Sequence, residues 1–325
     1  MRESKCGQRA LVGGALVCLS LLPLIPALSP QDSDIVERFR RITGNTEWIP
    51  VGAIPIRFDT FHPQGMAFVG EFFFFTSVEV THQTEMLERP VGGYDRTAGE
   101  GVGHLFKLDR DGNLIASVTL GEGEVYHPGG IDFDGRFIWI PVAEYRPNSR
   151  SIVYRVDPFS METTEVFRFD DHLGGLVFDT ADATLHGVSW GSRFFYSWEL
   201  NENLELTESQ FDPAERRVPN GSYYVDYQDC QYVPVHYMLC GGVKTHSIKA
   251  IGDSPSLGFT IGGLDLIDLR SRRAIHQVPI NWRVEDGPVM SANPFFVEPK
   301  DDHLRFFFMP EDNESTIYIF ETNRE

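Results

Sequence analysis

Cysteine and basic residues are scarce in this sequence. Only 4 of its 325 residues are Cys, too few for a fold that depends on a dense disulfide framework. Lys and Arg together number 28 against 47 Asp and Glu, which gives a net charge of −19. Nucleic acids and anionic membrane surfaces are themselves negatively charged, so this excess of acid argues against both as partners.

Long apolar runs are also missing, with one exception near the start. Three basic residues precede an uncharged, nearly all apolar stretch at 10–28, which contains two prolines near its end. That order is typical of a secretory signal peptide. The alternative is an uncleaved anchor, but the stretch is short for a membrane span and the prolines weaken a continuous helix. Both alternatives predict an exported protein (periplasmic, extracellular or in the secretory pathway) with no membrane span after this segment.

Aromatic residues, by contrast, are abundant. Phe alone occurs 25 times, and aromatic residues make up 13% of the chain. Aromatic side chains favour strands, so the composition predicts an all-β protein.

An eight-residue pattern recurs along the chain. HPQGMAFV at 62–69, HPGGIDFD at 127–134 and HLGGLVFD at 172–179 match closely, and weaker copies follow at 227–234 and 291–298. Two more β-like runs follow each copy, and most units contain a fourth. Four antiparallel strands in about 45 residues are the pattern of a β-propeller blade. Five copies therefore predict a five-bladed β-propeller.

The ring of blades must close, and each blade needs a fourth strand. The fifth unit lacks a fourth run, whereas 47–56 is a β-like run ahead of the first unit. We predict that 47–56 pairs with 316–321 and closes the ring, because an open ring would expose sheet edges. The alternative is that 47–56 only packs alongside. We expect the other fourth strands at 114–120, 163–169, 204–211 and 274–280.

These patterns divide the chain into three parts. Residues 1–29 are expected to be the signal peptide or anchor, and 30–45 a linker with a short amphipathic helix near 33–44. Residues 46–325 are expected to form a single propeller domain.

One family resembles this arrangement. The HPQG and HPGG entries, with DGRFIWIPVAEYRP at 134–147 behind the second, resemble an uncharacterised family of exported propeller-type proteins, the domain-of-unknown-function 6454 family. The resemblance would cover about residues 45–323. It implies a propeller and no assigned activity.

The propeller geometry gathers polar residues on one face. The connection into each first strand and the loop between its second and third strands emerge at the same mouth of the central channel, where propellers usually bind ligands. The entries place His62, His127 and His172 there in three consecutive units. Two insertions, 80–103 and 244–260, overhang the same mouth.

The three histidines predict a metal site, because neutral imidazole is a good ligand for zinc and other transition metals. We therefore expect one divalent metal ion at His62, His127 and His172. Two alternatives stay open: the imidazoles contact a non-metal ligand, or each caps its strand entry. The remaining histidines are expected to be structural or solvated, among them His104, His186, His236, His276 and His303.

The other candidates suit a small-molecule or carbohydrate-like ligand. Glu79 and Glu144 end second strands and could act as general acid and base in a hydrolase or lyase, although solvated carboxylates are common there. Further ligand contacts are expected from Gln64, His82, Tyr145, Tyr227, Asp229 and Asn293. The alternative function is a non-catalytic binding or scaffold propeller, which the fold allows equally.

One disulfide is predicted. Cys230 and Cys240 are equidistant from Val235, and 234–236 reads as a tight turn, so the two Cys face each other across a hairpin. The alternative is two buried free thiols.

Overall fold

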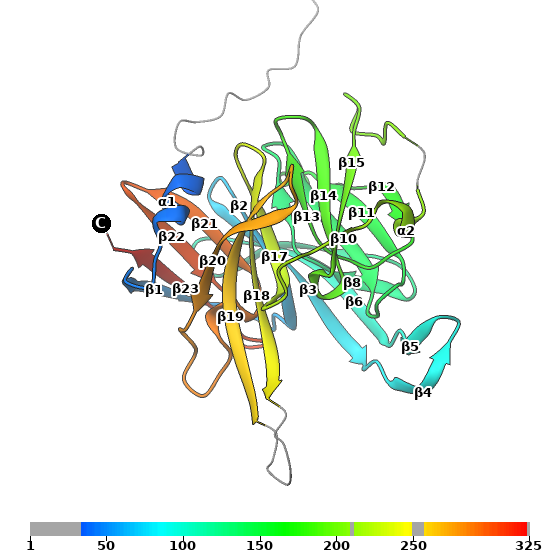
Figure 1. Ribbon diagram of the computed structural model, residues 1–325, viewed down its shortest axis with the longest axis horizontal. Helices are drawn as coiled ribbons and strands as arrows, with labels where there is room; N and C mark the ends of the chain where they lie inside the picture. The colour runs from blue at the N-terminus through cyan, green and yellow to red at the C-terminus, as the bar shows by residue number, and fades with distance from the viewer. Residues whose placement is uncertain (1–33, 209–210, 249–256, 324–325) are drawn as a thin grey trace, which may run out of the picture.

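Five antiparallel sheets are arranged around a common centre in the computed structural model (Figure 1). The structure describes residues 34–208, 211–248 and 257–323, so the predicted signal at 1–29 lies outside the described residues. The all-β, five-bladed propeller predicted from the repeat is confirmed.

Each sheet is one blade, numbered here in chain order. Blade 1 contains β2 (His62–Val69), β3 (Phe72–His82), β6 (Glu100–Leu108) and β7 (Leu114–Leu120). Blade 2 contains β8 (Val125–Pro128), β9 (Asp132–Phe133), β10 (Ile138–Glu144), β11 (Ser151–Val156) and β12 (Thr163–Phe169). Blade 3 contains β13 (Leu173–Asp179), β14 (Thr184–Ser189), β15 (Phe194–Glu199) and β16 (Val218–Pro219). Blade 4 contains β17 (Asp226–Val233), β18 (Tyr237–Ile248), β19 (Leu257–Asp268) and β20 (Arg273–Ile280). Blade 5 contains β21 (Phe295–Lys300), β22 (His303–Phe308), β23 (Thr316–Thr322) and β1 (Trp48–Pro55).

The N-terminal strand closes the ring, as predicted. β1 pairs antiparallel with β23, in a register that runs from Trp48 opposite Thr322 to Pro55 opposite Thr316. The first and last strands of the domain therefore share one blade, and each of the five sheets has a fourth strand.

The fourth strand of blade 3 is not where the sequence predicted it. In the described part of this segment, 204–208 and 211, no strand forms and a single bridge joins Leu206 to Leu200, whereas β16 lies further on, at 218–219. β16 pairs only with Phe194 and Phe195. The prediction was wrong because the apolar side chains of the loop pack on the blade core without forming a ladder.

The helix predicted near 33–44 is α1 (Ile35–Arg41). Its buried face, Ile35, Val36 and Phe39, joins the apolar cluster of blades 4 and 5. A second, short helix, α2 (Pro213–Arg216), lies in the loop before β16. No helix among the described residues is long and apolar enough to cross a membrane.

The centre of the ring is held by direct contacts between inner strands. Gly130 of blade 2 donates its N–H to the Gly174 carbonyl oxygen at 2.9 Å, and Leu176 N–H returns a bond to the Gly130 carbonyl oxygen at 3.2 Å. Buried Asp229 accepts N–H bonds from Met66, Ile131 and Phe295 in three other blades. These bonds fix the inner strands and hence the residues at their mouths.

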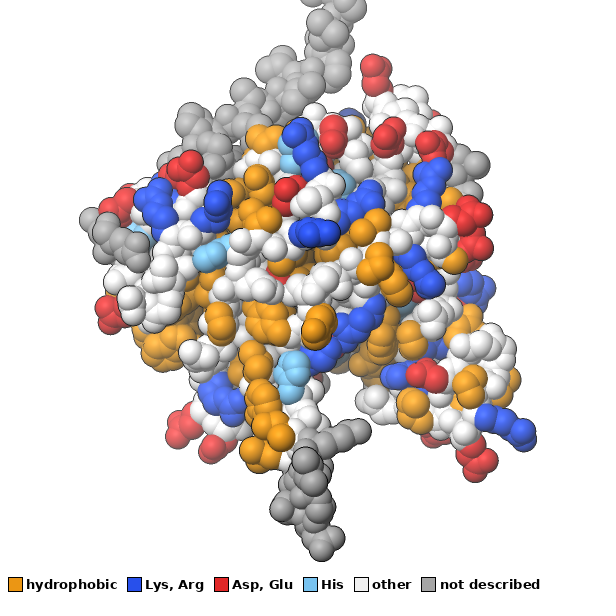
Figure 2. Space-filling model, viewed as in Figure 1, with side chains coloured by type: hydrophobic (Ala, Val, Ile, Leu, Met, Phe, Trp, Pro, Cys, Tyr) orange, Lys and Arg blue, Asp and Glu red, His pale blue; other side chains and the backbone are white. Residues whose placement is uncertain are grey.

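Both insertions extend to the same side of the ring, toward the bottom of Figure 1. The first carries a small hairpin of β4 (Met86–Val91) and β5 (Tyr94–Arg96), and the second lengthens the β18–β19 hairpin. Hydrophobic side chains are exposed along this longer hairpin, including Ile248 and Leu257 (Figure 2).

The predicted disulfide is confirmed. Cys230 and Cys240 are directly paired across β17 and β18, and their sulfur atoms are bonded. Residues 234–236 form the turn between these strands.

Candidate functional site at the channel mouth

The three entry histidines lie side by side, as the repeat predicted. His62 begins β2, His127 lies in β8, and His172 directly precedes β13. The ring centroids of His62 and His127 are 6.4 Å apart, and those of His127 and His172 are 6.0 Å apart. Consecutive blades therefore place consecutive imidazoles in a row across one mouth.

The outer two imidazoles are oriented by hydrogen bonds through Nδ1. His62 Nδ1 lies 2.8 Å from an Asp312 carboxylate oxygen, and His172 Nδ1 donates to the Glu144 carbonyl oxygen at 2.8 Å. An acceptor at Nδ1 leaves the lone pair at Nε2, which is the usual support for a metal-binding histidine. His127, between them, is buried, and neither of its nitrogens has a hydrogen-bond partner.

Burial keeps the imidazoles of His127 and His172 neutral. It lowers the pKa of His172 to about 4, against the opposing effect of the carbonyl acceptor. It also lowers the pKa of His127 well below the usual value, and the neighbouring imidazoles of His172 and His62 act in the same direction. Neutral imidazole is the form that binds metal ions, so these residues are ready to coordinate at neutral pH.

Aromatic and cationic side chains line the row of histidines. The Tyr145 ring stacks on His127 with centroids 4.1 Å apart, and Trp190 meets His172 edge-on at 4.7 Å. The guanidinium of Arg96, from β5, lies 5.2 Å above the Trp190 ring. The β4–β5 hairpin therefore does overhang the mouth.

The two predicted catalytic carboxylates lie in different surroundings. Glu144 is fully buried, and its carboxylate accepts bonds from Arg146 Nε at 2.6 Å and Arg150 Nε at 2.8 Å. Glu79 is part-exposed and lies 3.4 Å from His104 Nε2. Each carboxylate is thus engaged by its own cationic or imidazole partner, and their acid–base role stays a prediction.

Asn293 is the predicted ligand residue that joins the row most directly. It donates to Asp312 at 2.9 Å, so Asn293 and His62 meet on one carboxylate. Gln64 is buried and donates to the Pro63 carbonyl oxygen, while His82 is exposed at the end of β3. Asp312 was not predicted from the sequence, because it lies in the loop between β22 and β23, far along the chain from His62.

Tyr227 and Asp229 face other groups. The buried Tyr227 hydroxyl donates to Asp265 at 2.6 Å, within blade 4. The Asp229 carboxylate is occupied by backbone N–H groups of the inner strands. Both side chains make structural hydrogen bonds, and their predicted ligand contacts stay untested.

One family matches this chain. The family of unknown function DUF6454 matches residues 20–324. The chain belongs to this family. The resemblance read from the HPQG and HPGG entries is therefore confirmed, and membership brings no activity with it. No curated protein matches the sequence.

Solved structures are similar to this chain only distantly. A luciferin-regenerating enzyme is 9% identical, with 86% of this chain and 96% of that chain covered and a TM-score of 0.46. The periplasmic gluconolactonase PpgL of Pseudomonas aeruginosa is 12% identical, with 78% and 85% covered and a TM-score of 0.38. Hydrazine synthase of Kuenenia stuttgartiensis is 14% identical, with 83% and 58% covered and a TM-score of 0.38. At these values the likenesses carry no argument about function.

A second group of side chains in this protein could hold a metal ion. Ligand atoms of Asp179, Asp182 and His236 lie within 4.8 Å of one another at the other end of β13. His236 was expected to be structural or solvated, and no spacing in the sequence links these residues. Both its ring nitrogens have neighbours: Asp179 at 2.7 Å from Nδ1 and the Arg270 guanidinium at 2.6 Å from Nε2. A metal ion here would have to displace Arg270 or the Asp179 bond.

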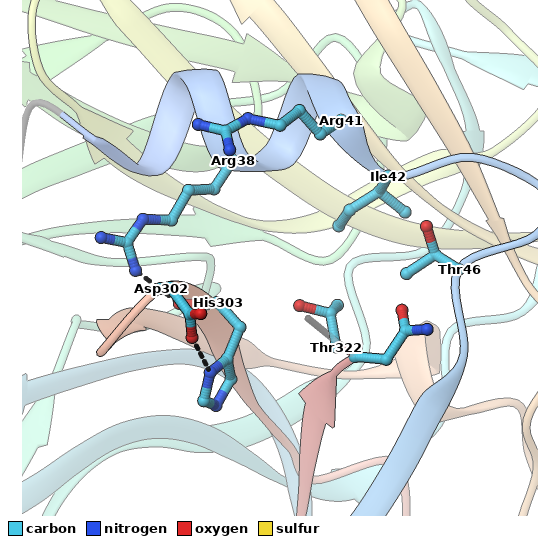
Figure 3. Close-up of a pocket in the computed structure, with 8 residues that line it drawn as sticks. Arg38, Arg41, Ile42, Thr46, Asp302, His303 and Thr322 are labelled. Atoms are coloured by element: carbon cyan, nitrogen blue, oxygen red, sulfur yellow. Dashed lines mark hydrogen bonds and ion pairs between the residues drawn. The ribbon is translucent and has the colours of Figure 1, made fainter. Parts of the chain in front are cut away.

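A small cavity of about 100 Å³ lies between α1 and blade 5 (Figure 3). Arg38 of α1 reaches across it and donates to the His303 carbonyl oxygen at 2.9 Å. These contacts hold the helix on the blade, and the cavity is separate from the channel mouth.

Proposed function

We propose that His62, His127 and His172 bind one divalent transition-metal ion at the channel mouth. The observation that carries this proposal is the buried His127, whose two nitrogens lack hydrogen-bond partners. Burying polar atoms without partners costs free energy, and a bound ligand would recover it. The flanking imidazoles, each with an acceptor at Nδ1, have the orientation that metal-binding histidines need.

The spacing of the rings sets a condition on this proposal. Zn–N bonds are about 2.0–2.1 Å, so three nitrogens on one ion must lie close together. Among the described residues, only Asp179, Asp182 and His236 bring three ligand atoms within 4.8 Å of one another, so the three imidazoles, with ring centroids 6.4 and 6.0 Å apart along the row, are too widely spaced as they stand. Binding must therefore draw the rings inward. His62 is best placed to move, because its Asp312 partner is half exposed.

A three-imidazole centre would leave a coordination position open for water or a ligand, which is the arrangement of hydrolytic and lyase metal sites. Tyr145 and Trp190 offer an aromatic wall on which a small-molecule or carbohydrate-like ligand can pack. The chain's own residues would then orient the ligand: Arg96 can pair with an acidic group, and Asp312 and Asn293 can accept and donate hydrogen bonds.

The second candidate is a non-catalytic binding propeller. It is favoured by Glu144, whose buried carboxylate is already held by two guanidinium groups. In that case the same mouth binds the ligand without turnover.

Export completes the proposal. The charged and apolar N-terminus supports it, and so does the Cys230–Cys240 disulfide, since such bonds persist mainly in oxidising compartments. Mass spectrometry of the protein secreted or released from its natural host tests it: a mature chain starting near residue 30 is expected, and an intact N-terminus in a cytosolic fraction would contradict it.

Titration with Co²⁺ tests the metal site, because tetrahedral Co²⁺ has visible absorption bands. We expect one equivalent to bind the wild type, and at least tenfold weaker binding to His127→Ala and His172→Ala. His246→Ala is the matched control, since His246 lies on the same face and bonds to the Tyr224 carbonyl oxygen outside the row. Asp179→Asn removes a ligand of the second group. Loss of binding in that variant alone would move the ion to the other end of β13 and end the proposal for the mouth.

A further inference from the structure

The shortened blade 3 leaves a cavity beside its outer edge. Because β16 pairs only with Phe194 and Phe195, the far half of β15 pairs with β14 on its inner side and has no strand on its outer side. A cavity of about 350 Å³ lies there. Its volume is within the range of small-molecule sites. Arg272, from the β19–β20 turn of blade 4, reaches it from the neighbouring blade.

Arg272 brings an uncompensated positive charge to this cavity. No carboxylate in the described part of the chain lies within ion-pair distance of it, and its Nε is buried without a hydrogen-bond partner. Burial lowers the pKa of Arg272, yet a guanidinium stays charged at neutral pH. The Arg272 side chain donates from Nη2 to the Ser197 hydroxyl oxygen at 3.2 Å. A half-buried cation without a counterion is costly unless an anion joins it.

His186 adds a neutral donor. It is paired with Ser197 across β14 and β15, with the hydroxyl 2.9 Å from Nδ1. Because Arg272 can only donate to the Ser197 oxygen, the hydroxyl hydrogen is free to point at Nδ1. Burial lowers the pKa of His186 to about 4, so the ring is neutral and its proton lies on Nε2. That N–H has no hydrogen-bond partner in the described chain.

Trp198 supplies an apolar wall and a further donor. It is 3% exposed, and its indole N–H lacks a partner. Its ring stacks with Phe211, with centroids 6.0 Å apart, and Leu206 lines the same cavity. The acidic residues nearby do not neutralise Arg272: Glu208 pairs with Arg216 at 2.6 Å, and Glu199 is exposed to solvent. Asp179, in the adjacent turn, is engaged by Tyr232 and His236.

We propose that this cavity binds a small organic anion, with its carboxylate or phosphate on Arg272 and its apolar body against Trp198 and Phe211. Unpartnered N–H groups on Arg272, Trp198 and His186 suit an acceptor-only group, and a guanidinium matches the geometry of both anions. The site is distinct from the channel mouth and requires no metal ion.

Isothermal titration with benzoate and with phenyl phosphate tests the proposal and separates the two anion types. We expect one of them to bind at micromolar to millimolar concentration, and benzyl alcohol, which has the same ring without the charge, not to bind. In Arg272→Gln the binding should weaken at least tenfold. The control is Arg168→Gln, an exposed arginine of β12 that is paired with Glu122 and Glu165 outside this cavity, and it should bind within about twofold of the wild type.

Trp198→Phe provides a second variant should Arg272→Gln fold poorly, because it keeps an aromatic ring while it loses the indole N–H and part of the ring system. It should weaken binding of the aromatic anion severalfold. Equal binding of benzyl alcohol, or unchanged affinity in both Arg272→Gln and Trp198→Phe, would overturn the proposal. So would the absence of heat from both anions with the wild type. Inorganic phosphate binding as tightly as phenyl phosphate would also overturn it, since the apolar wall would then play no part.

Discussion

The carboxylate of Asp229 accepts the backbone N–H of Met66 at 2.8 Å, although the two residues are 163 positions apart in the chain. Asp229 also accepts N–H bonds from Ile131, Phe295 and its neighbour Cys230, so one buried side chain serves strands of four blades. The ring is thus tied together at its centre as well as at its β1–β23 seam.

Asp229→Ala should therefore lower the free energy of unfolding by about 4 kcal/mol or more, since it leaves four backbone N–H groups without their acceptor and each such buried loss costs about 1–3 kcal/mol. Urea unfolding followed by tryptophan fluorescence measures it. Glu122→Ala, which removes an exposed carboxylate, is the control and should change stability by less than about 1 kcal/mol. A loss below about 1.5 kcal/mol in Asp229→Ala would contradict the central role.

A second buried carboxylate gives the fold a pH dependence. Burial raises the pKa of Asp132 to about 7, although N–H donors of Phe178 and Tyr232 favour its ionised form. The Asp132 carboxyl holds its proton more tightly in the folded state than in the unfolded chain, where its pKa is near 3.8. Its contribution to stability is therefore complete below pH 3.8 and is lost as the pH rises toward about 7. Asp132 should therefore contribute a fall of about 1.4 kcal/mol per pH unit across that window.

Unfolding free energies of the wild type and Asp132→Asn at pH 5, 6, 7 and 8 check this prediction. The difference between the two proteins isolates Asp132, because burial raises the pKa of Asp229 as well and contributes to both. The difference should shrink steadily from pH 5 to pH 7 and level off above pH 8. A constant difference at all four values would show that Asp132 does not titrate in this window.

The blades could be read from the sequence because their signals are local. Apolar β-like runs and turn residues recur in every unit, the HPQG, HPGG and HLGG entries mark the first three, and the missing fourth strand of blade 5 pointed to β1. The strand predicted at 204–211 was wrong. These residues alternate like a strand, but Phe211 stacks on Trp198 as part of a loop, and the place beside Phe194 is taken by β16.

The candidate site was predictable only where the repeat itself carried it. The row of His62, His127 and His172 follows from equal positions in consecutive blades. Arg96 lies in β5 of the first insertion and Asp312 in the loop between β22 and β23; neither belongs to the repeated pattern, so the repeat did not place them there. Asp229 has the frame of a mouth residue, but its carboxylate turns to backbone donors in other blades, a contact that depends on the closed ring.

Removal of the closing strand should disrupt the whole domain. Without residues 47–56, β23 becomes an exposed edge and the cluster under Trp48 opens, so the single cooperative melting transition should be lost. Trp48→Ala should cost about 2–4 kcal/mol, because the ring packs on Phe306 at 4.8 Å. Val51→Ala, on the same strand but 47% exposed, should have little effect. An unchanged melting curve in the deletion variant would refute closure by β1.

The Cys230–Cys240 bond should stabilise the fold modestly, by about 2–3 kcal/mol, because it closes a short loop. Cys230→Ser with Cys240→Ser should lower the unfolding free energy by that amount, and reductant should not lower it further. The other two cysteines, Cys6 and Cys18, lie in the predicted signal. Native mass spectrometry after alkylation should therefore find no reactive thiol in the mature protein. Two alkylated cysteines would contradict the bond in solution.

Two equivalent glycines of the repeat should respond differently to the same substitution. A Cβ at Gly129 would lie 2.4 Å from the Gly174 carbonyl oxygen, and that oxygen is fixed by its bond from Gly130. Gly129→Ala should therefore force the inner strands of blades 2 and 3 apart and cost about 2–3 kcal/mol. A Cβ at Gly174 would meet nothing closer than 3.6 Å, so Gly174→Ala should be neutral or slightly stabilising through the unfolded chain. Thermal unfolding of the two variants tests this prediction. Equal melting temperatures for Gly129→Ala and Gly174→Ala would contradict the close approach of the inner strands of blades 2 and 3 at Gly129.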